Sequence, residues 1–246
     1  MTVKTKLVLA AGWGMHYHVW QPISEPLTQR FKLHYADLPG HGGCAYEGEL
    51  KTLDSWTHNL LKRTPDQAIW MAWSLAGLAA IHVAVHHPER IKRLILVAST
   101  PCFAQKEDWP YGLSQQALAD FSANLDKPSE KVIRRFIAIQ ALASKDAQQY
   151  RQQLHALLAG APLADKQALR DGMALLTDTD IRNKLSKINC PCDFILGEHD
   201  TLAPQGIERE IGLLNPNITL RIITGAGHAP FLSHRDEFTR LVDQIL

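Results

Sequence analysis

Short apolar runs alternate with amphipathic stretches along most of this chain. Runs bounded by turn-forming residues are typical of strands buried on both faces of a parallel sheet. Six runs have this character: Leu7–Ala11, Leu33–Ala36, Ala68–Trp73, Leu94–Ala98, Phe194–Leu196 and Ile218–Ile223. Helix-like stretches occupy Trp20–Thr28, Leu53–Arg63, Leu75–His87 and Glu237–Ile245. The alternation predicts an α/β fold, with a mostly parallel sheet and helices on both of its faces.

The stretch from Ala104 to Leu176 breaks this alternation. It is rich in Ala, Leu, Gln, Lys and Arg, which favour helix, so we expect several helices inserted between two strands. Residues 1–103 and 177–246 then form the core, and residues 104–176 form a helical cap. An insertion at the carboxyl edge of a sheet can cover an active site. A peripheral helical layer without a functional role is the alternative.

Composition narrows the classes of function. The 246 residues suffice for one large domain, and a net charge of +1 offers no overall attraction to nucleic acid or to an anionic membrane. No apolar run approaches the roughly 18–20 residues that span a bilayer. The four cysteines include one close pair, Cys190 and Cys192, without a second pair at zinc spacing. We therefore expect a cytoplasmic, monomeric protein with reduced cysteines, no metal and no cofactor.

Ser74 lies where an apolar run meets an Ala-rich helical stretch, which is the context of a nucleophile elbow. Strand and helix nearly touch at such a turn, so the residues two before and two after the serine must be small. Ala72 and Ala76 stand at these positions, where glycine is usual, and Gly77 follows one step later. A serine that merely caps an ordinary helix is the alternative.

A serine nucleophile needs a base and an acid that orients the base. In α/β sheets with a nucleophile elbow, the chain order is Ser, then Asp or Glu, then His. Asp200 and His228 follow the last two predicted strands in that order, and Glu198 is the second candidate for the acid. Four other histidines fit the pattern less well: His86, His87, His199 and His234.

An oxyanion hole needs two amide donors. The amide of Leu75, directly after the nucleophile, is the expected first donor. The amide of Trp13 is the expected second, because it follows the first predicted strand and is flanked by Gly12 and Gly14. An ordinary glycine-rich turn is the alternative.

Several segments carry a resemblance to a known family. D-L-P-G-H-G (37–42) and H-P-E-R (87–90) are generic to the α/β-hydrolase superfamily. More particular segments occur in one order: G-W-G (12–14), W-S-L (73–75), S-T-P-C-F (99–103), D-W-P (108–110), R-F-I-A-I-Q (135–140) and G-H-A-P-F (227–231). Nearly the whole chain therefore resembles this superfamily and, within it, the esterases that act on the methyl ester of pimeloyl-[acyl-carrier protein] in biotin synthesis.

The resemblance implies a reaction and a set of contacts. It implies that Ser74 attacks the methyl ester of a pimeloyl chain carried on acyl carrier protein, that methanol leaves, and that water then cleaves the acyl-enzyme. It implies that Trp13 and Leu75 contact the ester. It also implies that one helical segment lines the acyl channel: Phe136, Ile137, Ala138, Ile139 and Gln140.

The sequence also departs from the superfamily pattern. Ala11 stands where the superfamily has a histidine before the oxyanion-loop glycine, and alanines replace both elbow glycines. The segment before the first run is short, so we expect the usual first antiparallel strands to be missing and the sheet to have six or seven strands.

An acidic carrier protein would need a basic docking surface. Lys131, Arg134 and Arg135 stand at positions i, i+3 and i+4, so they would share one helix face, and Lys145 and Arg151 could extend the patch. A solvated helix face without a partner is the alternative.

Other functions remain open on the residues alone. A general short-chain carboxylesterase, a thioesterase or a C–C bond hydrolase acting on free substrates would use the same three residues. A catalytically inactive binding protein on the same fold is the alternative outside enzymes.

Overall fold

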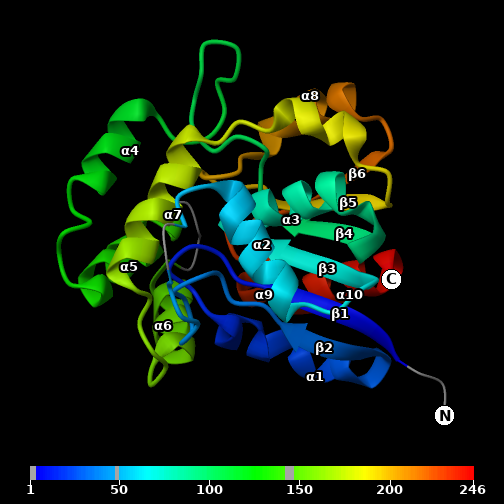
Figure 1. Cartoon of the computed structure of the whole chain (residues 1–246), viewed down its shortest axis with the longest axis horizontal. Coiled ribbons are helices and arrows are strands. Elements are labelled where there is room, and N and C mark those ends of the chain that lie inside the picture. The colour runs from blue at the N-terminus through cyan, green and yellow to red at the C-terminus, as the bar shows by residue number, and fades with distance from the viewer. Residues whose placement is uncertain (1–3, 48–49, 142–146) are drawn as a thin grey trace.

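The computed structural model describes residues 4–47, 50–141 and 147–246, and a six-stranded sheet runs through its centre (Figure 1). The strands are β1 (Thr5–Ala10), β2 (Phe31–Tyr35), β3 (Ala68–Trp73), β4 (Ile91–Val97), β5 (Cys192–Gly197) and β6 (Ile218–Ile223). Their order is β2-β1-β3-β4-β5-β6, and every neighbouring pair is parallel. The predicted parallel sheet and the shortened strand count are confirmed.

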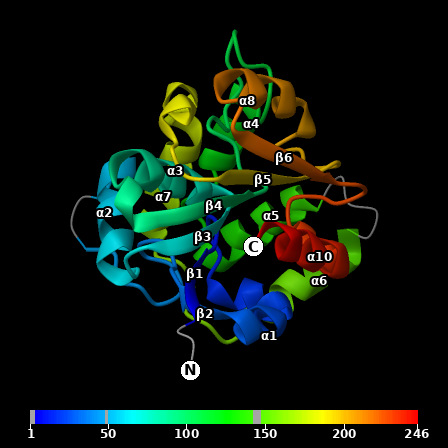
Figure 2. The ribbon, with the colours of Figure 1, turned by 90° about the vertical axis from the view of Figure 1, so that its right-hand side faces the viewer.

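Helices cover both faces of the sheet, as Figure 2 shows. On one face lie α2 (Leu53–Arg63) and α3 (Leu75–His86), and on the other lie α1 (Gln21–Arg30) and α10 (Arg235–Ile245). Because the central strands are covered on both sides, every residue of β3 and β5 is buried. This burial explains why β3 is an unbroken apolar run and why β5 is apolar apart from Asp193, whose carboxylate pairs with Arg93 and Arg221.

The chain reverses its direction of winding between β1 and β3. From β1 it passes to β2 at one side, and from β2 it returns to β3 on the other side of β1. Connections that leave neighbouring strands in opposite directions open a crevice at the carboxyl ends of those strands. Ala10 at the end of β1 pairs with Ala72 near the end of β3, so the residues that follow both strands meet at this crevice.

The described residues of the insertion after β4 form four α-helices: α4 (Gln115–Ser122), α5 (Ser129–Gln140), α6 (Ala147–Leu158) and α7 (Lys166–Asp178). They gather on one side of the molecule, on the left in Figure 1, away from both ends of the chain. The predicted insertion is therefore helical, and its last helix runs two residues past the expected boundary at residue 176.

Some elements differ from the sequence prediction. Strand β2 begins at Phe31, two residues before the expected run, and its side chains are partly exposed because it is an edge strand. Helix α8 (Glu208–Leu214) was not predicted, since seven residues are too few for a helical period to stand out. The remaining helices are short: α9 (Pro230–Ser233) and the 3₁₀ turns Tyr17–Trp20, Pro88–Arg90, Arg182–Lys187 and Gln205–Ile207.

Candidate active site

Ser74 occupies a strained turn between β3 and α3. Its φ and ψ are 57° and −126°, a conformation that residues other than glycine rarely adopt. Its amide donates a hydrogen bond of 3.0 Å to the carbonyl of Val97 at the end of β4, which helps to hold the turn. Ala72 and Ala76 are fully buried beside it, so the fold accommodates their methyl groups where glycines are usual.

The His228 ring points at this serine. Its Nε2 lies 2.9 Å from Ser74 Oγ, and the ring is buried. Two features place the loop that carries it. Trp73 Nε1 donates to the carbonyl of His228 at 2.7 Å. Gly197, at the end of β5, lies so close to the loop that a Cβ there would be 2.3 Å from the carbonyl oxygen of Gly227.

Asp200 lies behind the histidine, in the turn after β5. His228 Nδ1 is 2.9 Å from Asp200 Oδ2 and 3.0 Å from Oδ1. The amides of Leu202 and Ala203 also donate to Oδ1, at 2.8 and 3.1 Å. A carboxylate only accepts hydrogen bonds, so the proton sits on Nδ1, and Nε2 is left to accept the serine hydroxyl. The structure thus joins the three candidate residues in one chain of hydrogen bonds.

The rival candidates have other partners. Glu198 accepts a hydrogen bond of 2.8 Å from the amide of Gly225, so this carboxylate fastens the loop that carries His228. The neighbouring His199 contacts the same loop, because its backbone amide donates to the carbonyl of Ala226 at 2.8 Å. His86 is the last residue of α3, and its Nε2 lies 2.9 Å from Lys184 Nζ. His234 Nδ1 lies 2.9 Å from the hydroxyl of its neighbour Ser233.

The loop after β1 lies directly against the serine. A Cβ on Gly12 would be 2.9 Å from Ser74 Cβ, so only glycine allows this approach. Trp13, the residue after Gly12, is held by its own side chain. Its Nε1 donates to the carbonyl of Leu169 at 2.9 Å, and its ring packs edge-on against Phe136. Leu75 begins α3, where the helix dipole favours negative charge. Gly12, the residue before Trp13, therefore lies against Ser74, and Leu75 follows Ser74 directly in the chain.

A cavity of about 400 Å³ opens beside Ser74 and is mostly apolar. Its apolar lining comes from α4, α5, α7 and the loops beside them: Phe103, Leu113, Ala117, Leu118, Phe121, Phe136, Ile139, Met173, Leu176 and Leu202. Two charged side chains, Asp120 and Arg135, also border it. The contributions of α4 and α7 were not predicted from the sequence, although the apolar face of each amphipathic helix is the signal that predicts burial.

The predicted channel segment supplies two residues to this lining, Phe136 and Ile139. Ile137, Ala138 and Gln140 are not among the described residues that line it. Helical geometry accounts for Ile137 and Ala138, because residues three apart share a face of α5 and the two residues between them point elsewhere. Gln140 instead accepts a hydrogen bond of 3.0 Å from the buried hydroxyl of Tyr150 on α6.

Tyr150 is a further residue near the site that the sequence analysis did not single out. Burial, together with the nearby charge of Asp200, raises the pKa of the Tyr150 phenol above its ordinary value. The phenol therefore stays protonated and donates its hydrogen to Gln140. Through this bond α6 is tied to α5 behind the cavity.

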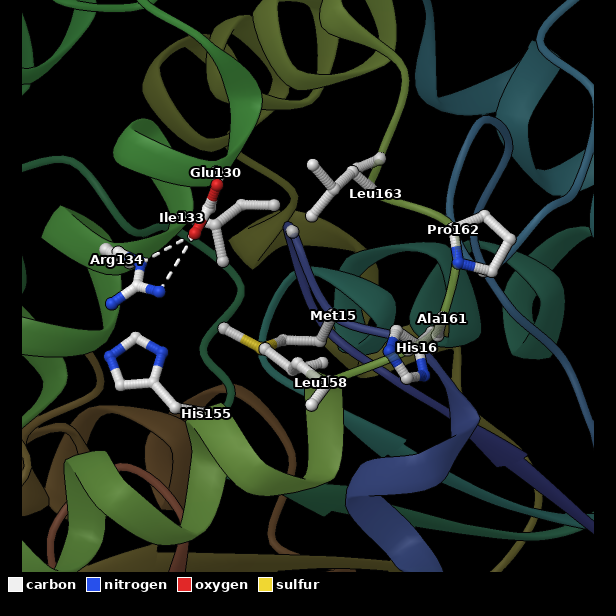
Figure 3. A pocket seen from close by; sticks show the side chains of 15 residues that line it. Met15, His16, Glu130, Ile133, Arg134, His155, Leu158, Ala161, Pro162 and Leu163 are labelled. Atoms are coloured by element: carbon white, nitrogen blue, oxygen red, sulfur yellow. Dashed lines mark hydrogen bonds and ion pairs between the residues drawn. The ribbon is translucent and has the colours of Figure 1, made fainter.

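A second cavity, of about 350 Å³, lies between α5, α6 and the loop from Gly14 to His16 (Figure 3). Ser74 is not among the described residues that line it. The ion pair between Arg134 and Glu130, at 2.8 Å, lies at its edge near His155. Burial, with the nearby charge of His18, lowers the pKa of His16 to about 4, so its ring is neutral at physiological pH.

The described docking candidates are exposed on α5 and α6, and two of them also border a cavity: Arg135 the cavity beside Ser74, and Arg134 the second cavity. Lys131, Arg134 and Arg135 are exposed on α5, and Arg135 also extends over the Phe121 ring, 5.8 Å from its centroid. Arg151 is exposed on α6. Lys145 lies outside the described residues. Arg134 forms an ion pair with Glu130, which partly neutralises its charge. Lys131 and Arg135 are the other exposed cations of α5.

Residues 7–241 match the model of a family described as the alpha/beta hydrolase family. The chain belongs to the alpha/beta hydrolase family. Its curated relatives include the pimeloyl-[acyl-carrier protein] methyl ester esterases of Salmonella typhi and Salmonella enteritidis PT4 (strain P125109). Each is 39% identical over 232 residues, which are 94% of this chain and 90% of the relative. The family resemblance that the motifs predicted is confirmed, and the chain is a hydrolase.

Among solved structures, this alpha/beta hydrolase is similar to a bromoperoxidase from Bacillus anthracis. The TM-score is 0.86 at 21% identity, with 99% of this chain and 92% of that one covered. At such identity the likeness supports the fold alone. In the part of the chain that the structure describes, no group of His, Cys, Asp or Glu could hold a metal ion. None of the described helices is long and apolar enough to cross a membrane.

Proposed function

We propose that this chain is a serine carboxylesterase in which Ser74 is the nucleophile, His228 the general base and Asp200 the acid that orients the base. The observation that carries the proposal is the buried hydrogen-bonded chain from Ser74 Oγ through His228 to Asp200, beside an apolar cavity. A serine hydroxyl held 2.9 Å from the imidazole Nε2 is placed for proton transfer as it attacks.

The reaction has two halves. Ser74 Oγ forms a bond to the ester carbonyl carbon while its proton passes to His228 Nε2. The tetrahedral intermediate collapses, the proton moves from His228 to the leaving alkoxide, and an alcohol departs. Water then attacks the acyl-enzyme with His228 as the base, and the carboxylic acid is released. Asp200 stabilises the imidazolium that forms in each half.

The amides of Trp13 and Leu75 form the proposed oxyanion hole. Both amides belong to backbone that is held before a substrate binds. The buried side chain of Trp13 anchors the first, and Leu75 is the first residue of α3. Donors fixed before the reaction stabilise the developing negative charge without reorganising, which is why such sites accelerate acyl transfer strongly.

The proposed substrate is the methyl ester of a pimeloyl chain on acyl carrier protein, in biotin synthesis. Relatives with this name are 39% identical to nearly the whole chain. The cavity suits such an acyl chain, because it is about 400 Å³ in volume and its lining is dominated by apolar side chains that would contact methylene groups. We place the reaction in the cytoplasm and the protein in a monomeric state.

The proposed division of labour assigns residues 1–103 and 177–246 to the catalytic core and residues 104–176 to a cap. Support comes from the cavity, because α4, α5 and α7 supply most of the walls around Ser74. The proposed docking surface for the acidic carrier is the exposed basic side of α5 and α6, with Lys131, Arg134, Arg135 and Arg151 as its described members.

The decisive test of hydrolysis is covalent labelling. We expect a fluorophosphonate probe to modify Ser74 in the wild-type chain and to leave Ser74→Ala unlabelled. Ser74→Ala and His228→Ala should each lower kcat on the order of 10⁴-fold or more, since the three residues act as a unit. A folded wild-type protein that the probe does not label would favour a binding protein without catalysis.

A second test addresses the carrier. The value of kcat/KM for the carrier-bound methyl ester should exceed that for the same ester free in solution. Lys131→Ala, at an exposed residue of α5 that is not in the described lining of the cavity, should lower the carrier-bound value about three- to tenfold and leave a free short-chain ester within twofold. Arg209→Ala, an exposed arginine on α8, is the matched control and should change neither. A variant that keeps wild-type activity on both substrates would favour a general short-chain esterase or a thioesterase, for which the basic cluster is dispensable.

A further inference from the structure

The end of β4 holds both main-chain groups of the nucleophile. The Ser74 amide donates to the carbonyl of Val97 at 3.0 Å, and the Ser74 carbonyl accepts a hydrogen bond of 3.0 Å from the hydroxyl of Ser99. Between these two residues lies Ala98, whose φ is 45° although it is not glycine. Its amide is anchored to the carbonyl of Ile195 at 2.8 Å, and the surrounding sheet thus holds a strained residue in place.

The Ser74 carbonyl has two donors. Besides Ser99 Oγ, the amide of Gly77 donates to it at 2.8 Å, so both lone pairs of this oxygen are used. The same peptide unit ends in the amide of Leu75, which is the proposed first oxyanion donor. A peptide is planar, so fixing the direction of its carbonyl also fixes the direction of its N–H. Hydrogen bonds along a chain polarise one another, so a bound carbonyl makes its amide a better donor.

Gly77 is part of this arrangement. A Cβ at position 77 would lie 2.0 Å from Ser99 Oγ and 2.6 Å from Ser99 Cβ, so any larger residue would displace the hydroxyl. The elbow tolerates alanine at positions 72 and 76 but has no space for it at position 77. This contact explains why glycine remains in the elbow one residue after its usual place.

We infer that Ser99 is a positioning residue for ester hydrolysis, which acts through the Ser74–Leu75 peptide to hold and polarise the oxyanion donor. The inference rests on the proposed function. Ser99 is fully buried, its hydroxyl is bonded to the Ser74 carbonyl, and it is not among the described residues that line the cavity. Its effect should therefore appear in the transition state and leave substrate binding unchanged.

The test compares Ser99→Ala with wild type on p-nitrophenyl butyrate. We expect kcat to fall about three- to tenfold, the loss typical of one hydrogen bond, with KM within twofold. The affinity for an alkyl trifluoromethyl ketone, which forms an oxyanion on Ser74, should fall by the same factor. The midpoint of the pH–rate profile should not move, because His228 and Asp200 are untouched. The variant should fold, since Gly77 still satisfies the Ser74 carbonyl.

Thr100→Val is the matched control. Thr100 is the next residue, is equally buried, and its hydroxyl donates to the carbonyl of Cys102 at 3.1 Å without contacting Ser74. This variant removes a comparable buried hydroxyl and should retain wild-type kcat. If Ser99→Ala matches wild type, matches Thr100→Val, or loses activity through KM alone, the inference is wrong while the proposed function stands. If wild type is neither active nor labelled at Ser74, both fail together.

Discussion

The indole of Trp73 donates a hydrogen bond of 2.7 Å to the backbone carbonyl of His228. Trp73 is the residue before the nucleophile, and His228 lies 154 positions beyond Ser74. The bond therefore ties the strand that carries the serine to the loop that carries the base. Both groups are buried, so the carbonyl has no water to replace a lost donor.

Trp73→Phe should lower both activity and stability. The aromatic contact with Phe231 can persist, but the His228 carbonyl loses its donor, which costs about 1–3 kcal/mol of unfolding free energy. Trp70→Phe is the matched control, because Trp70 is fully buried in the same strand and its Nε1 has no hydrogen-bond partner among the described residues. Urea unfolding and kcat measured on both variants check the prediction. An equal loss in the two would mean that packing, and not the hydrogen bond, matters.

Substitution of the two candidate acids, Asp200 and Glu198, should lower kcat by very different factors. Asp200→Asn should reduce kcat by about 10³- to 10⁴-fold, because an amide can hold the imidazole in the wrong tautomer. Glu198→Gln should stay within about tenfold of wild type, since Glu198 contacts the Gly225 amide and not the imidazole. Steady-state kinetics on one ester suffice for the comparison. A larger loss in Glu198→Gln than in Asp200→Asn would reverse the assignment of the acid.

Ile139 allows a test of the acyl cavity. It lines the cavity and is only partly buried, so Ile139→Trp should narrow the space without disrupting the core. We expect KM for a seven-carbon acyl ester to rise about tenfold and KM for an acetyl ester to stay within twofold. Ala138→Val, on the neighbouring position that is not in the described lining, should change neither value. Equal effects on both esters would mean that the acyl chain binds elsewhere.

Asp37 should make stability depend on pH. Burial, opposed by the Tyr17 backbone amide and the charge of Arg63, raises the pKa of this carboxyl from 3.8 to about 6. Between these two values the folded state binds more protons than the unfolded state, so this group's contribution to stability falls as pH rises. Its full effect at neutral pH is on the order of 2–3 kcal/mol.

Asp37→Asn isolates that contribution. Buried histidines such as His41, whose pKa is lowered to about 4 mainly by burial, act in the opposite direction over an overlapping range. The difference between variant and wild type cancels their effect. Urea unfolding at pH 4, 5, 6 and 7 should show the variant gaining stability relative to wild type as pH rises. A constant difference across this range would contradict the raised pKa.

Sequence alone was enough for the order of the strands along the chain, the helical insertion and the three residues of the candidate triad. Each of these leaves a local mark in the sequence: Ser74 and Asp200 follow the apolar runs of the buried strands β3 and β5, and His228 follows the mostly apolar run of β6. Because carboxyl ends of parallel strands lie at one edge, the pattern could place all three residues together before any coordinate was known.

Only the tertiary structure decided which side chains surround that edge. Phe136 and Ile137 are adjacent, apolar and buried, yet Phe136 lines the cavity and Ile137 is not in its described lining. The packing of α5 against its neighbours determines which face of the helix is turned toward the cavity. The hydrogen bond from Ser99 to the Ser74 carbonyl, and the space that excludes a side chain at Gly77, depend on strands β3 and β4 lying in register. Such contacts join residues distant in sequence at ångström precision, and no local pattern of apolar and polar positions encodes them.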